Sequence, residues 1–132
     1  MTRIFREICL CTDKKKRKSC KKLKALFDSG ATYSHIDSRQ VEGFEDVYRE
    51  YSEPEHITLA TKDKTAEIIG DLSLYAEIED CFVENVQLFR VTKGLKTDVI
   101  IGADIMESLG IVLDPKDDKL FFKKCPPDVG LI

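Results

Sequence analysis

The chain has 132 residues, of which 42% are hydrophobic and 34% charged, and its net charge is −3. This composition is typical of one soluble globular domain over residues 1–132 and excludes a disordered or fibrous chain. No stretch approaches the roughly 18 consecutive apolar residues of a membrane span. The first ten residues carry charges where a secretion signal needs an apolar core. We therefore expect a cytoplasmic protein without a membrane partner.

Positive charge is concentrated near the N-terminus. Residues 1–31 hold ten Lys/Arg and three Asp/Glu, whereas residues 32–132 hold eleven and twenty-one. Most of the excess lies in the basic segment, residues 14–24, which could contact nucleic-acid phosphates. The segment has no interleaved aromatic residues to stack on bases. We favour a solvent-exposed hairpin tip over a nucleic-acid interface.

Five cysteines occur, at positions 9, 11, 20, 81 and 125. An odd number in a chain without a secretion signal argues against a disulfide framework. Cys9, Cys11 and Cys20 are close in sequence, but they form no CxxC pair and have no histidine nearby, as a zinc site usually requires. We expect reduced thiols, no metal and no organic cofactor.

The N-terminal part of the chain predicts a hairpin and a short strand. Apolar residues recur at strand spacing in residues 2–11 and 20–27, on either side of the basic segment. The second strand runs into a turn at Gly30, and a short strand over Tyr33–Ile36 leaves that turn. Residues 38–51 have a helical stripe interrupted by a glycine, which predicts a short helix and an irregular connection.

The middle of the chain predicts further strands. Residues 57–78 have apolar positions at mostly even spacing around a polar centre, which predicts a long hairpin with a charged, exposed end. The same strand pattern continues from residue 82 to residue 88.

The C-terminal part predicts a buried strand, a short helix and a last hairpin. The apolar run Val99–Gly102 is typical of a buried strand. Ala103–Leu109 predicts a short helix that Gly110 stops. Two strands follow, over residues 111–113 and 119–124, joined by a turn that contains proline.

Two motifs carry the chemical signal. Asp28, Ser29, Gly30 and Ala31 follow the apolar strand end Ala25–Phe27, so the carboxylate is rigidly held; alone, this motif is an ordinary turn. About seventy residues later stands VIIGADIMESLG. The segments LFDSGATYSHI, ITLATKDKTAEIIGDLSLYAEI and DVIIGADIMESLGIVLD together resemble the retropepsins, the single-domain aspartic proteases of retroviruses and retrotransposons. The three segments occur in the same order and spacing as in the family, and the resemblance covers about residues 20–114.

The resemblance implies a mostly β fold, a closed barrel-like sheet with one or two short helices. Asp28 matches the catalytic aspartate, Ser29 the residue that locks two active-site loops together, and Gly30 the glycine whose carbonyl lies along the substrate. The strand that braces the active-site loop matches Ile100, Ile101 and Gly102. The substrate-binding residues implied are Ala31 and, at the tip of a flap, Ala60, Thr61, Lys62, Asp63 and Lys64.

The chain has one Asp-Ser-Gly motif, so the resemblance implies a homodimer with two Asp28 carboxylates facing each other. Two carboxylates a hydrogen bond apart cannot both ionise, so they share one proton. The ionised group takes a proton from water, and the protonated group polarises the scissile carbonyl. Relatives join their N- and C-terminal strands, here residues 2–11 and 119–124. We expect an aspartic endopeptidase that binds peptide or protein substrates in extended form.

The sequence also departs from the viral pattern. Thr32 and Ala103 stand where many viral members have a paired acidic residue and arginine, and the flap tip is charged rather than glycine-rich. Asp104 agrees with retrotransposon-type members, and we interpret it as a helix-start residue. His35 and His56 have no nucleophile at a recognisable spacing, so we interpret both as structural.

A second interpretation is a binding module, in which the same dimer grips extended peptides or another protein with little hydrolysis. The intact Asp28-Ser29-Gly30 motif counts against it. A third and more remote interpretation is a nucleic-acid-associated factor that uses the basic segment.

Overall fold

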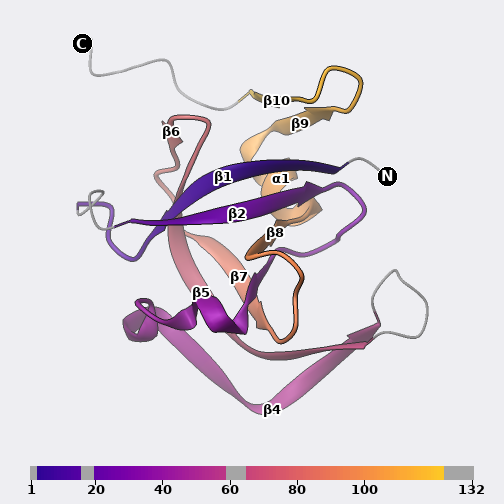
Figure 1. The fold of residues 1–132 in the computed structure, drawn as a ribbon. Coiled ribbons are helices and arrows are strands. Elements are labelled where there is room, and N and C mark those ends of the chain that lie inside the picture. The colour runs from indigo at the N-terminus through magenta and orange to yellow at the C-terminus, as the bar shows by residue number, and fades with distance from the viewer. Residues whose placement is uncertain (1–2, 16–19, 59–64, 124–132) are drawn as a thin grey trace.

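The computed structural model describes residues 3–15, 20–58 and 65–123. Within them lie an eight-stranded sheet, a two-stranded sheet and one α-helix (Figure 1). The strands and the helix α1, in chain order, are β1 (Arg3–Cys11), β2 (Lys21–Asp28), β3 (His35–Asp37), β4 (Tyr48–Thr58), β5 (Thr65–Ile78), β6 (Cys81–Phe82), β7 (Gln87–Thr92), β8 (Val99–Ile101), α1 (Ala103–Leu109), β9 (Ile111–Asp114) and β10 (Lys119–Phe122). The expected mostly β architecture is confirmed. No helix in these ranges is long and apolar enough to cross a membrane.

The large sheet has the order β1-β2-β8-β3-β7-β5-β4, with β6 beside β5. β1 and β2 form the expected antiparallel hairpin, in which Ile4 lies opposite Phe27. β1 also pairs with the C-terminal end of β5, where Leu10 lies opposite Ala76. Alternate residues of β1, such as Ile4 and Ile8, are buried, as the period of two predicts. β1 therefore pairs with both β2 and β5, two strands that are separated by β8, β3 and β7 in the sheet order.

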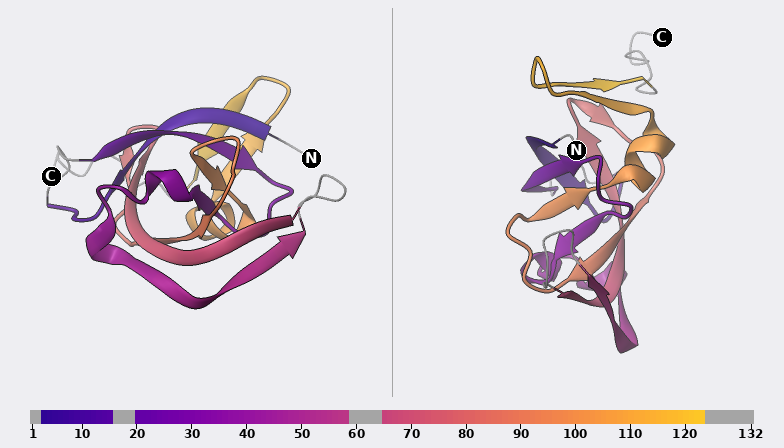
Figure 2. Two further views of the ribbon diagram at one scale, coloured as in Figure 1. Left: turned by 60° about the horizontal axis from the view of Figure 1, so that its bottom comes forward. Right: turned by 90° about the vertical axis from the view of Figure 1, so that its right-hand side faces the viewer.

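The long hairpin expected from the sequence is β4–β5, and it curves around one end of the molecule (Figures 1 and 2). The expected flap tip, residues 60–64, lies outside the described residues. β4 already begins at Tyr48, so the helix expected over residues 38–51 is wrong in that part. Tyr48 pairs with Leu72 of β5, and this pairing overrides the helical stripe. Two 3₁₀ helices, Ser38–Val41 and Glu45–Val47, take the place of one helix.

The C-terminal elements follow the prediction closely. β8 leads into α1, and Gly110 ends the helix with φ of 69°, a left-handed conformation that glycine adopts without strain. β9 and β10 pair as an antiparallel hairpin. This hairpin and the β4–β5 hairpin lie at opposite ends of the molecule (Figures 1 and 2). The strand expected over Tyr33–Ile36 forms two residues later, as β3.

The core lies on one face of the large sheet. Phe27, Ile36, Leu72, Phe89 and Ile101 are completely buried there. Each comes from a different strand, and burying a side chain of this size contributes about 1.5–3 kcal/mol. The core therefore joins β2, β3, β5, β7 and β8 into one unit beneath the turn that follows Asp28.

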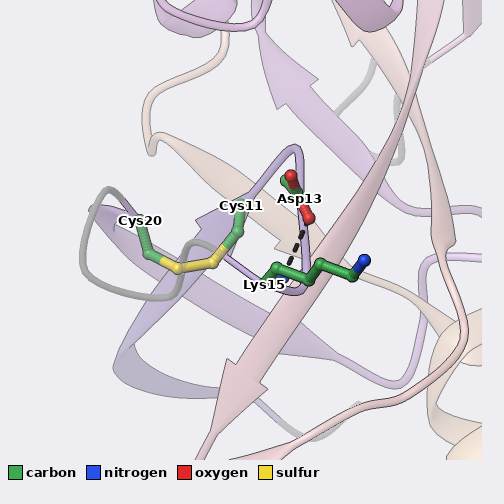
Figure 3. Close-up of a disulfide and its surroundings, with 4 residues drawn as sticks. All are labelled: Cys11, Asp13, Lys15 and Cys20. Carbon is green, nitrogen blue, oxygen red and sulfur yellow. Dashed lines mark hydrogen bonds between the residues drawn. A yellow bond between two sulfur atoms is a disulfide. The ribbon is translucent and has the colours of Figure 1, made fainter.

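Cys11 and Cys20 form a disulfide (Figure 3). This contradicts the expectation of reduced thiols at these two positions. The register of the β1–β2 hairpin places Leu10 opposite Lys21, so the next pair outward is Cys11 and Cys20, with Cα atoms 4.5 Å apart. Such a separation suits a disulfide. Cys9 keeps a free thiol, and burial is the main cause that raises its pKa.

The basic segment follows Cys11 and extends into β2. Its residues 16–19 lie outside the described residues. In the part described, the backbone N–H of Lys15 donates to Asp13 Oδ1 at 2.8 Å (Figure 3). No group of three or more potential metal ligands occurs in the described ranges.

Candidate active site

Asp28 is the last residue of β2, a strand held between β1 and β8. The Gly30 backbone N–H donates to Asp28 Oδ1 at 2.9 Å, and the Ala31 N–H donates to the Asp28 carbonyl at 3.1 Å. These bonds close a tight turn and fix the carboxylate. Asp28 is 8% exposed, whereas Ser29 beside it is exposed. The turn therefore presents one oriented carboxylate at the end of a rigid strand.

Arg3 is a neighbour of Asp28 that the sequence did not reveal. It lies directly opposite Asp28 in the β1–β2 register, and its Nε is 3.6 Å from Asp28 Oδ2. The Arg3 side chain is largely exposed, so the pair contributes little to stability. Its effect is to place a positive charge beside the carboxylate in the single chain.

β8 and the start of α1 support the residues 28–34, which we call the motif loop. Leu26 pairs with Ile100, and Phe27 with Ile101, in parallel register. The Ala103 N–H donates to the Ala31 carbonyl at 2.7 Å. The sequence-predicted set Ile100, Ile101 and Gly102 thus lies directly beside β2 and the motif loop.

Gly102 is required for this approach because of space. A Cβ added there would lie 2.5 Å from the Tyr33 carbonyl oxygen and 2.7 Å from that of Ala31. Both distances are shorter than van der Waals contact. The motif loop and α1 can therefore pack this closely only when residue 102 has no side chain.

Ser34 and Asp104 link the two segments through hydrogen bonds. The Ser34 hydroxyl donates to Asp104 Oδ1 at 2.7 Å and accepts from the Gly102 N–H at 2.9 Å. The Ser34 N–H donates to Asp104 Oδ2 at 3.2 Å, and the Asp104 N–H donates to the Thr32 carbonyl at 3.1 Å. Asp104 is in the first turn of α1, which agrees with its interpretation as a helix-start residue. Ser34 carried no sequence signal, because a serine in a loop is common.

One face of the sheet carries Asp28 together with residues from three other strands. Leu26 is two positions before Asp28 on β2, so both side chains leave the same face. Residues paired across strands also share a face. Leu26 pairs with Ile100, Ile100 with His35, and His35 with Arg90. This row, opposite to the core, is called the Asp28 face.

His35 lies on the Asp28 face and is 8% exposed. Its Nδ1 is 2.8 Å from the Thr92 hydroxyl. The pKa of His35 is lowered from 6.5 to about 4, mainly by burial and further by the positive charge of Arg90. The negative charge of Asp104 acts in the other direction and raises this pKa. His35 is therefore neutral at pH 7, which fits its structural interpretation. His56 is exposed on β4.

A shallow hollow of about 230 Å³ opens beside the motif loop, between α1 and β9. It is lined by Ser29, Ala103, Met106, Glu107, Ile111 and Leu113. Nearby, the β9–β10 hairpin exposes Val112 and Phe121, and β1 exposes Phe5. Ser29 of the motif loop therefore borders a hollow whose lining is partly apolar, whereas Val112 and its partner Phe121 leave the other face of the hairpin.

No family model and no curated protein matches the sequence. Solved structures nevertheless share its fold. The retroviral protease-like domain of Ddi1 from Leishmania major has a TM-score of 0.65 and 20% identity, over 93% of this chain and 90% of that one. The EIAV protease, complexed with the inhibitor HBY-793, has a TM-score of 0.60 and 18% identity, over 86% of this chain and 93% of its own. The chain therefore has a retropepsin-like fold.

Proposed function

We propose that this retropepsin-like chain is an aspartic endopeptidase that acts as a homodimer, with one Asp28 carboxylate from each subunit. The observation that carries the proposal is the fixed carboxylate of Asp28. It ends a buried strand, and the Gly30 N–H orients it. In the dimer, a water between the two carboxylates loses a proton to one of them while the other polarises the peptide carbonyl. No metal or organic cofactor takes part.

The remaining parts of the site have proposed roles as well. Ser29 locks the two motif loops together, and Gly30 and Ala31 bind the substrate backbone. Ile100, Ile101 and Gly102 brace the loop, which their contacts with β2 and the loop support. The flap tip, residues 60–64, closes over the peptide. The pairing of β1 with both β2 and β5 supports a closed barrel-like sheet.

The dimer interface is proposed to join the N- and C-terminal strands, residues 2–11 and 119–124. Support comes from the exposed apolar side chains Phe5 of β1 and Val112 and Phe121 of the β9–β10 hairpin. A partner strand that covered these side chains would remove their apolar surface from water. Ser29, the residue proposed to lock the two motif loops together, lines the hollow beside α1.

Cleavage of a diverse peptide pool between about pH 3 and 7 tests the proposal, because a carboxylate pair that shares a proton works in this range. The wild type is compared with Asp28→Asn, and with Asp46→Asn, which removes an exposed carboxylate of the 3₁₀ helix Glu45–Val47. We expect cleavage by the wild type and by Asp46→Asn, and none by Asp28→Asn. A wild type that is folded and dimeric by light scattering but cleaves nothing would support the peptide-binding module instead.

A further inference from the structure

We propose that Arg90 and Tyr33 form a subsite that selects an acidic residue in the substrate peptide. This inference rests on the proposed endopeptidase function and names a class of substrate for it. The ligand chemistry is a carboxylate, which a guanidinium binds through two parallel N–H donors.

The first argument is position. Arg90 lies on the Asp28 face, because it pairs with His35, which pairs with Ile100. Its backbone N–H donates to the Ser34 carbonyl at 3.0 Å, so β7 is attached to the motif loop. Arg90 is half-buried, and its charge is therefore less screened by water than that of a surface arginine.

The second argument is preorganisation. The Arg90 Cζ atom lies 3.8 Å from the ring centroid of Tyr33, which belongs to the motif loop. A guanidinium stacked on an aromatic ring keeps its N–H groups accessible at its edge, because they point outward in the plane of the guanidinium. The stack thus holds the donors of Arg90 in one orientation and reduces the entropy lost when a carboxylate binds.

The third argument is the missing partner. The described residues contain four other arginines, and each has a carboxylate within ion-pair distance: Arg3, Arg6, Arg39 and Arg49. Arg90 has none among the described residues. Asp71, its cross-strand neighbour on β5, is bound by Arg49 and by the Tyr51 hydroxyl. A half-buried cation beside the motif loop is therefore available to an anion from outside the chain.

Strand spacing places the subsite along the peptide. Three strand intervals of about 4.8 Å separate β2 from β7. Asp28 lies two residues beyond Leu26, which is in the same row across the sheet as Arg90. The Cα atoms of Asp28 and Arg90 are therefore roughly 15 Å apart. An extended peptide advances about 3.3 Å per residue, and the long side chains of arginine and glutamate shorten the path. The acidic residue therefore lies roughly two to four positions from the cleaved bond. Because the homodimer is two-fold symmetric, an equivalent subsite lies on the other side of that bond.

The test uses one peptide that the wild type cleaves, with Glu, Gln or Lys placed in turn at the second to fourth positions on either side of the bond. We expect Glu to raise kcat/KM about tenfold over Gln at one of these positions, the size typical of a charge-assisted hydrogen bond. Arg90→Gln should abolish the preference, and Arg90→Glu should reverse it in favour of Lys. Lys93→Gln, which removes an exposed charge just after the same strand, should leave the preference unchanged.

Two substitutions of Tyr33 test the stack between its ring and the Arg90 guanidinium. Tyr33→Phe should keep the preference, whereas Tyr33→Leu should weaken it. Melting temperatures of all variants establish that they are folded. Cleavage with equal rates for Glu and Gln, or a preference that survives in Arg90→Gln, would overturn the subsite while leaving the endopeptidase function standing.

If the wild type cleaves no peptide, the proposed function fails and the subsite is tested by binding. Glu and Gln peptides are then compared on immobilised wild type and Arg90→Gln, as free acids and as C-terminal amides. Retention of Glu peptides that requires Arg90 and is independent of amidation supports the side-chain subsite. Retention that amidation removes would assign Arg90 to a peptide C-terminus and reject the side-chain preference, and equal retention of all peptides would reject the subsite.

Discussion

Replacing His35 should remove a specific part of the acid sensitivity of the fold. The unfolded chain binds a proton on this imidazole below pH 6.5, whereas in the folded chain burial and the charge of Arg90 lower its pKa to about 4. Between these values the unfolded state holds more protons, so stability falls as the pH falls, and below about pH 4 this contribution is constant. At about 1.4 kcal/mol per pKa unit, the wild type loses about 3 kcal/mol from this residue.

Urea unfolding at one fixed protein concentration, from pH 8 to pH 4, measures this loss. The free energy of unfolding of the wild type should fall by about 3 kcal/mol more than that of His35→Gln over the interval. His56→Gln, which removes the exposed histidine of β4, should keep the loss seen in the wild type. Parallel pH profiles for the wild type and His35→Gln would refute the reasoning. The interval also overlaps the pH range of the cleavage assay, so stability must be measured together with activity.

Three further variants test the packing around the site. Gly102→Ala should cost about 1–3 kcal/mol by forcing a Cβ against two carbonyl oxygens of the motif loop, and should lower kcat/KM about 100-fold because Asp28 is displaced; an unchanged melting curve would contradict this. Ser34→Ala should cost about 1–3 kcal/mol, because it leaves the buried Gly102 N–H without its acceptor, as thermal unfolding measures. Cys11→Ser with Cys20→Ser should lower the free energy of unfolding by about 2.5 kcal/mol, the value for a loop of about ten residues. Cys9→Ser removes the free thiol but keeps this disulfide, so it is the control and should unfold like the wild type.

Local patterns predicted the elements that depend on neighbouring residues. The helix Ala103–Leu109 with Gly110 at its end was visible from periodicity and turn residues, and so was β5. Only the last two residues of β4 were expected as strand, because its first part carries a helical stripe. The motif residues 28–31 were located because their order and spacing resemble a known pattern. All these features can be predicted without knowing which strands, distant in sequence, lie side by side in the sheet.

The features that the sequence did not predict depend on strand pairing. The disulfide of Cys11 and Cys20 follows from the register of β1 and β2, which the cysteine count does not contain. The Asp28 face follows from the parallel pairing of β3 with β7 and the antiparallel pairing of β3 with β8. Arg90 is far from Asp28 in sequence, so only this long-range arrangement brings its guanidinium beside the motif loop.

The edge strand β4 bears on the solubility of the protein. In the described sheet β4 pairs with β5 alone, so its other side presents unpaired backbone groups that another chain could bind. Pro54 cannot donate a hydrogen bond there, and the register shifts between Glu50 and Glu55. Exposed charges, including Glu53, occupy the same stretch. These features oppose the addition of further strands at this edge, so amyloid-like stacking through β4 is disfavoured even at high protein concentration.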